Sequence, residues 1–167
     1  STKKLLLVPG SGGDPMRAIE ALPGVILDGD EGEPAVRGSS PDDNYYQTDH
    51  MPVGYLFHTM GDSIFNPNII EDFSLKAGAW DSQYSDAIGS VLDTRLRDPY
   101  HEDIKTTVDF SLLRAGVLVE GAVTENSAFY AAWREGLLDW YFDNIKDEEE
   151  DIAITQVPKY NDYQLKY

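Results

Sequence analysis

Apolar and polar residues alternate along the sequence from Thr106 onward, and this alternation constrains the fold more than any other feature. A period of two puts successive side chains on opposite faces of a β-strand. The apolar positions with this spacing are Val108, Phe110, Leu112, Val117, Val119, Phe129, Ala131 and Trp133. Residues 124–126 have the polar composition of a tight turn, and residues 160–167 alternate again. The sequence therefore predicts antiparallel strands with one apolar and one polar face.

The part of the chain before Pro99 differs, because its apolar runs are short and are interrupted by Gly, Pro, Asn and Asp. Such runs predict short strands joined by irregular connections. They are residues 25–27, 35–36, 45–46, 69–75 and 91–92. A short helix is predicted over residues 14–22, since Asp14 is a good N-cap and Pro15 fits the first helical position. The Pro-Gly pair at 23–24 would end it.

The charge balance excludes one class of partner. The chain has 30 acidic and 13 basic residues, which gives a formal net charge of −17. Proteins bind nucleic acids through clustered Lys and Arg, so no nucleic acid is expected as a partner. The hydrophobic content of 41% allows a core. No run of about 18 apolar residues occurs, so no membrane-spanning helix is predicted.

No pattern in the sequence predicts catalysis, a metal or a cofactor. There is no cysteine, and the three histidines lack the spacing of a metal-binding pair. Asp28, Asp30 and Glu33 resemble the start of a calcium loop, but Ser39 stands where the closing Glu would be. The main expectation is therefore a protein that is not an enzyme.

Four segments carry a resemblance to a known family. Residues 13–25 run through a short helix into Leu-Pro-Gly-Val, and residues 33–38 end in Val-Arg-Gly. Residues 48–53 read Thr-Asp-His-Met-Pro-Val. Residues 68–92 contain Ile-Glu-Asp-Phe, then a Gly, a Tyr and Ala-Ile-Gly-Ser-Val-Leu. In this order the segments resemble the plug domain of TonB-dependent outer-membrane receptors.

The resemblance implies an α+β fold in two parts. Residues 1–100 would be a plug of short mixed strands and short helices, with its N-terminal part incomplete. Residues 101–167 would be the first antiparallel strands of a truncated transmembrane β-barrel. The aromatic residues Trp133, Trp140, Tyr141 and Phe142 gather where a strand would leave the membrane, as an interfacial girdle requires.

The resemblance also implies a function, a location and partners. The plug would gate a TonB-dependent transporter that takes up a scarce nutrient, such as a siderophore, vitamin or sugar, across the outer membrane of a Gram-negative bacterium. Expected partners are TonB, through an N-terminal box that this chain lacks, the rest of its own β-barrel, outer-membrane lipid and a small nutrient ligand.

Two sets of site residues follow from the resemblance. Arg37 and Glu71 would pair with the barrel wall and lock the plug, and a planar guanidinium suits such pairing. The alternatives are a surface arginine before a turn glycine and an exposed strand residue. The expected ligand contacts are Asp42 and Asp43 in one loop and Tyr55, Phe57 and His58 in another. The second loop could instead be packed beneath its neighbours.

The sequence departs from the family pattern at several places. His50 stands where the family usually has Gly, Gly78 is followed by Ala79 instead of Pro, and Ser85 replaces a Gly. Two other functions stay open at this point. One is a soluble periplasmic or surface binding module with an antiparallel β-sheet, and the other is a calcium-dependent hydrolase.

Overall fold

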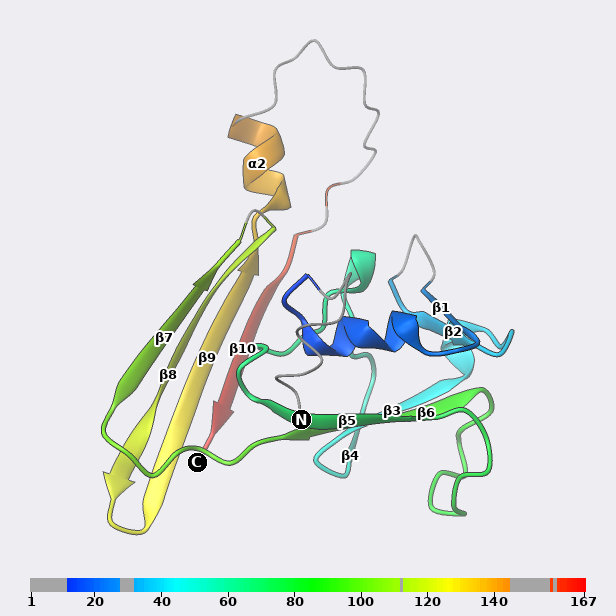
Figure 1. Ribbon diagram of the computed structural model, residues 1–167, viewed down its shortest axis with the longest axis horizontal. Helices are drawn as coiled ribbons and strands as arrows, with labels where there is room; N and C mark the ends of the chain where they lie inside the picture. The colour runs from blue at the N-terminus through cyan, green and yellow to red at the C-terminus, as the bar shows by residue number, and fades with distance from the viewer. Residues whose placement is uncertain (1–11, 28–31, 112, 145–156, 158) are drawn as a thin grey trace. The chain divides into compact units, whose positions relative to one another are not determined.

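The computed structural model describes residues 12–27, 32–111, 113–144, 157 and 159–167 (Figure 1). The chain divides into two compact units, Ser1–Arg97 and Asp98–Tyr167. Within the described part, no helix has both the length and the apolar character needed to cross a bilayer.

The first unit begins with the predicted short helix, which is confirmed as the 3-10 helix η1 (Pro15–Ala21). Asp14 caps it, since the Met16 backbone N–H donates to Asp14 Oδ1 at 2.9 Å. Met16 and Ile19 are fully buried. Strands β1 (Val25–Leu27) and β2 (Pro34–Val36) follow and pair antiparallel with each other.

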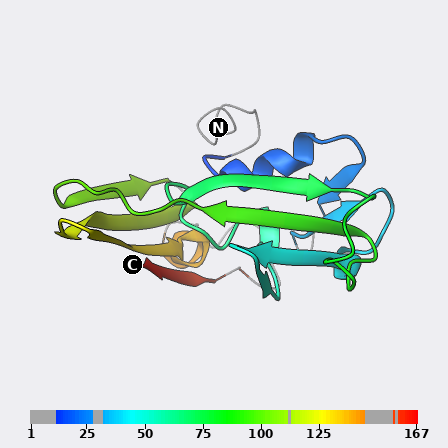
Figure 2. The same cartoon turned by 90° about the horizontal axis from the view of Figure 1, so that it is seen from below.

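A four-stranded mixed sheet forms the body of the first unit, in the order β4-β3-β6-β5. Its strands are β3 (Asn44–Thr48), β4 (Met51–Val53), β5 (Ile70–Lys76) and β6 (Ser90–Leu96). Strands β3 and β6 run parallel, and the other pairs are antiparallel (Figure 2). The remaining 3-10 helices are η2 (Pro41–Asp43) and η3 (Thr59–Gly61). The short strands predicted before Pro99 are therefore confirmed.

Helix η1 contributes to the core of this unit. It packs near β5 and β1, and the Thr94 hydroxyl of β6 lies 4.0 Å from Met16 Sδ. The buried apolar side chains of this unit include Val36, Leu56, Phe65, Ile69, Val91 and Leu92. They come from strands and connections alike, so the connections are part of the packed body.

A two-residue turn joins β3 to β4. Asp49 and His50 both have positive φ, 48° and 67°, as a type I′ hairpin turn requires. Asp49 also anchors the turn to β6, because its Oδ1 accepts from the Leu96 N–H at 3.0 Å. His50, in contrast, is exposed and occupies a conformation that favours glycine.

We therefore expect His50→Gly to stabilise the first unit. Relief of the left-handed strain outweighs the extra entropy of an unfolded glycine by roughly 0.5–1 kcal/mol. Urea denaturation followed by circular dichroism measures the change. Asp49→Gly is the matched control at the neighbouring position, and it should destabilise because it removes the bond to Leu96 N–H. A lower midpoint for His50→Gly would contradict the strain argument.

The second unit is a four-stranded antiparallel sheet in the order β10-β9-β8-β7. Its strands are β7 (Lys105–Phe110), β8 (Arg114–Thr124), β9 (Ser127–Gly136) and β10 (Asn161–Lys166). The strands and the tight turn predicted at residues 124–126 are confirmed, while Leu112 lies outside the described residues. The described strands form an open sheet, not a closed barrel.

An α-helix that the sequence analysis did not predict, α2 (Leu138–Asn144), follows β9. It contains three of the four aromatic residues assigned to an interfacial girdle, namely Trp140, Tyr141 and Phe142. Trp133 lies within β9. The aromatic cluster therefore begins in the strand but continues on a helix beyond its end.

Candidate functional site

The sheet of the second unit exposes its apolar face. Residues directly opposite one another on neighbouring strands share a face, and the register pairs Val108 with Val117, Val117 with Trp133, and Trp133 with Tyr163. On this face Val108 is 69% exposed, and at the ends of the face Phe110 and Leu165 are 79% and 77% exposed. A soluble sheet would cover such a face.

The opposite face of the same sheet is largely buried and carries charged residues among apolar ones such as Leu118 and Ala132. Four of its charged side chains are at most 9% exposed: Arg114, Glu120, Arg134 and Asp162. Arg134 Nε lies 3.5 Å from Asp162 Oδ2 on the neighbouring strand, and its guanidinium stands over the Tyr160 ring at 5.6 Å. Charges are usually buried only when they are paired. The polarity of this sheet is therefore inverted relative to a soluble protein.

Arg37 lies at a turn with a strained backbone. Arg37 and Gly38 have φ of 52° and 84°, and the Ser39 N–H donates to the Val36 carbonyl across the turn at 3.1 Å. The Arg37 side chain is exposed within the described residues. Its stem passes Gly24, where an added Cβ would lie 3.4 Å from Arg37 Cγ. An arginine in a left-handed conformation is uncommon, and such strain often marks a functional position.

Glu71 lies on β5, the edge strand of the mixed sheet. The register between β5 and β6 shifts between Ile70 and Asp72, so Glu71 occupies a β-bulge. Its side chain is exposed. Bulges change the direction in which a side chain points, so both residues assigned to the plug lock occupy irregular backbone on the surface of their unit.

The loop expected to contact ligand presents only part of its predicted set. Tyr55 is 53% exposed, and its ring lies 6.2 Å from that of His58, which is partly exposed. Phe57, however, is only 3% exposed, and Leu56 beside it is fully buried. The structure thus brings Tyr55 and His58 together on the surface, while Phe57 packs inward.

The other expected ligand loop has a clear structural role. Asp43 closes a capping box in η2, since its Oδ2 accepts from the Ser40 N–H at 3.1 Å. Its backbone carbonyl accepts from the N–H groups of both Ile88 and Gly89. Asp42 is exposed beside it. Asp42 is therefore the member of this pair with a side chain open to a ligand.

Sequence analysis missed a cluster around Tyr84. Tyr84 is 4% exposed, and its hydroxyl accepts from Lys76 Nζ at 3.3 Å and from Gln47 Nε2 at 3.5 Å. Tyr45 meets its ring edge-on, with the centroids 5.9 Å apart. These contacts fasten the connection between β5 and β6 to the sheet. The sequence offers only an aromatic residue within a polar segment as a sign of this cluster.

Two pKa shifts reflect local structure in the described residues. Burial raises the pKa of the Tyr46 hydroxyl above its ordinary value, against a smaller opposing effect of the hydrogen bond from Asn44. In the second unit, the hydrogen bond from Lys159 lowers the pKa of Asp139. Their ion pair, 2.8 Å long, ties the first turn of α2 to the residues before β10.

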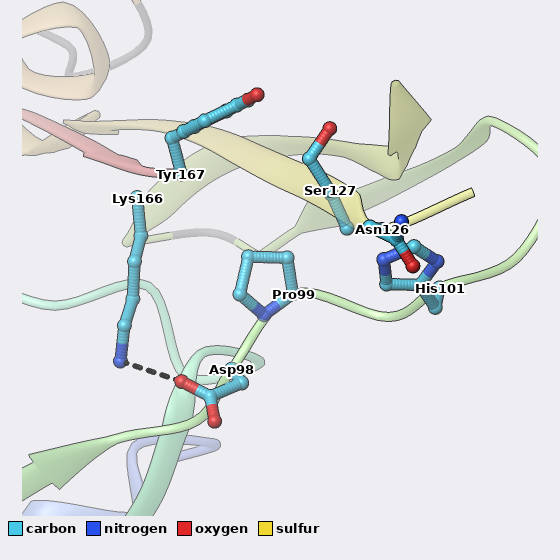
Figure 3. A pocket seen from close by; sticks show the side chains of 8 residues that line it. Asp98, Pro99, His101, Asn126, Ser127, Lys166 and Tyr167 are labelled. Carbon is cyan, nitrogen blue, oxygen red and sulfur yellow. Dashed lines mark ion pairs between the residues drawn. The ribbon is translucent and has the colours of Figure 1, made fainter. Parts of the chain in front are cut away.

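The second unit also contains a shallow pocket of about 370 Å³ at the turn between β8 and β9 (Figure 3). His101, Asn126, Ser127 and Tyr167 are among its lining residues, and Lys166 Nζ lies 3.2 Å from Asp98 Oδ1 at its edge. The described residues contain no group of three or more His, Cys, Asp or Glu side chains that could hold a metal. Asp28 and Asp30 of the candidate calcium loop lie outside the described residues.

Comparison with known proteins finds similarity of fold. No family model matches the sequence and no curated protein matches it. Solved structures do match, each over 81% of this chain. The siderophore receptor PirA from Acinetobacter baumannii has a TM-score of 0.60 at 19% identity. The siderophore receptor PirA from Pseudomonas aeruginosa has a TM-score of 0.57 at 21% identity. The ferric enterobactin receptor PfeA from the same species, in complex with enterobactin, has a TM-score of 0.56 at 16% identity.

The similarity covers only part of those receptors. The chain spans 24%, 26% and 24% of the three solved chains, so it corresponds to about a quarter of their length. The resemblance to TonB-dependent receptors predicted from the sequence is confirmed at the level of the fold.

Proposed function

We propose that this chain is the gating plug and the first wall strands of a TonB-dependent transporter in the outer membrane of a Gram-negative bacterium. The observation that carries the proposal is the inverted polarity of strands β7–β10, with apolar residues exposed and charged residues buried. Lipid-facing apolar residues and a polar interior are what a transmembrane β-barrel requires.

The connections between these strands support the same assignment. The β8–β9 turn is only Glu125 and Asn126, whereas β9 and β10 are separated by residues 137–160. Outer-membrane barrels have short turns on the periplasmic side and longer loops outside. On this proposal, α2 and its aromatic residues lie on the external side.

The first unit would act as the gate. A plug must shift or loosen locally while the wall stays intact, and polar contacts suit that role better than a continuous apolar seal. Arg37 and Glu71 are proposed to hold the plug in place through pairs with the surrounding wall. Tyr55, His58 and Asp42 are the proposed nutrient contacts, with Phe57 supporting the first two from beneath. TonB is the proposed partner that supplies energy for gating.

The proposed cargo is a small nutrient. Two of the structural neighbours are named as siderophore receptors and the third as a ferric enterobactin receptor, so ferric siderophores are the first class to test. The fold neighbours are receptors and not enzymes, which favours a role without catalysis.

Uptake by the full-length protein tests the proposal. Cells that depend on it should accumulate iron from a panel of ferric siderophores, and accumulation should stop when the proton gradient is collapsed or TonB is deleted. The protein should fractionate with the outer membrane. Recovery in the periplasm without detergent would instead support a soluble binding module.

A further inference from the structure

The Asp14 side chain joins two segments that lie far apart in the sequence. Its carboxylate is fully buried. Oδ1 accepts from the Met16 N–H at 2.9 Å, and Oδ2 accepts from the Ser63 N–H at 2.9 Å and the Ser63 hydroxyl at 2.7 Å. Met16 lies in η1, while Ser63 lies 49 residues further along, in the loop after β4. One carboxylate thus holds the start of η1 against that loop.

The loop that Asp14 holds is itself closed by backbone hydrogen bonds. The Ile64 N–H donates to the Leu56 carbonyl at 2.9 Å, and the His58 N–H donates to the Asp62 carbonyl at 2.7 Å. Phe57 and Ser63 form a β-bridge between these two bonds. Residues 56–64 therefore form a compact hairpin, and a displacement at Ser63 moves His58 with it.

A second link between η1 and the loop is weaker. Arg17 Nη1 lies 4.0 Å from Asp62 Oδ1, and its Nε is 3.3 Å from Glu20 Oε1 on its own helix. The contact with Asp62 is long for an ion pair, and the Arg17 guanidinium is shared with Glu20. The buried, charge-assisted hydrogen bonds of Asp14 are shorter and stronger. Asp14 is therefore the principal connection.

We propose that Asp14 is a relay that makes η1 and the 56–64 hairpin move as one body. Asp14 is a positioning residue, since it acts through Ser63 and Met16. The consequence rests on the proposed function: the hairpin carries His58 and adjoins Tyr55, while η1 follows the N-terminal region on which TonB would pull. Nutrient binding at one end and force at the other would then be coupled through a single carboxylate.

Asp14→Asn separates capping from coupling. Asparagine caps a helix as well as aspartate does, so Met16 N–H keeps its acceptor. The amide NH₂ would then face Ser63, so the Ser63 N–H would lose its acceptor, and only the Ser63 hydroxyl could rotate to accept from the amide. Hydrogen exchange of residues 56–64 in the purified full-length protein should become faster by about tenfold or more. Ala21→Ser, at an exposed position on the same helix, is the control and should leave this exchange unchanged.

The coupling between η1 and the hairpin is tested by destabilising η1 at a residue other than Asp14. Ala18→Gly weakens the helix itself, and it should speed exchange of residues 56–64 in the protein with Asp14. In the Asp14→Asn background the same change should add nothing. If Ala18→Gly leaves the hairpin unaffected with Asp14 present, or acts equally in both backgrounds, the relay is wrong.

Two features keep the test decisive. Ser63→Ala removes the hydroxyl and retains the backbone donor, so it deletes one of the two hydrogen bonds to Ser63 and should give a smaller effect of the same sign if Asp14→Asn fails to fold. Hydrogen exchange of residues 56–64 is also measured on purified protein, without any transport assay. A protein that imports nothing could still show the coupling, and a working importer could lack it, so the relay and the proposed function fail separately.

Discussion

Val108→Arg is expected to abolish stable assembly of the protein in the outer membrane. Val108 is 69% exposed on the apolar face of β7, and on the proposed function this face meets lipid. An arginine near the middle of the bilayer costs roughly 2–4 kcal/mol. Heat-modifiable migration on gels and protease resistance of the full-length protein in outer-membrane vesicles measure the loss.

The neighbouring residue provides a matched control. Thr107 precedes Val108 on the same strand, and its side chain points to the opposite, polar face. Thr107→Arg introduces the same side chain and should be tolerated far better. In a soluble module the order would reverse, because an exposed valine accepts an arginine at almost no cost. Equal assembly of both variants would therefore remove the main support for a membrane wall.

This contrast shows how far the sequence determines the fold. Alternation at residues such as Val108, Asp109 and Phe110 predicts strands and two distinct faces, since the period of a strand is fixed by its geometry. Alternation alone does not say which face is covered. Burial of Glu120 and Arg134 beside exposed Phe110 decides that, and it depends on packing that a local pattern does not contain.

The candidate site also has some features that the local sequence predicts and others that it does not. Local signals predict Asp14 as an N-cap and the strand at Tyr46, because capping and strand formation depend on near neighbours. The bond from Ser63 to Asp14 spans 49 residues, and no spacing rule predicts a contact of that range. Nor does composition distinguish Tyr55, which is exposed, from Phe57, which is buried two residues later.

Backbone strain adds information that the resemblance alone does not supply. Arg37, Asp49 and His50 have left-handed φ values in turns of the first unit. Asp49 is compensated by its bond to Leu96 N–H. Arg37 is exposed within its unit, and on the proposed function the pairing of its guanidinium with the wall would offset the strain.

Arg37→Gly is accordingly expected to stabilise the plug and at the same time to make the transporter leak. Glycine accepts φ of 52° without steric cost, which should raise the free energy of unfolding of the first unit by roughly 0.5–1 kcal/mol. Loss of the guanidinium removes the proposed pairing with the wall. Single-channel conductance of the full-length protein in planar bilayers should then show frequent openings that the wild type lacks.

Two further variants separate strain from pairing. Arg37→Ala keeps the strained backbone and loses the guanidinium, so it should leak without gaining stability. His50→Gly relieves a similar φ in the same unit but removes no proposed wall contact, so it should gain stability without leaking. A closed, fully active transporter carrying either change at Arg37 would show that this arginine is a surface turn residue. If His50→Gly leaked as much as Arg37→Gly, the openings would come from turn flexibility and not from the lost guanidinium.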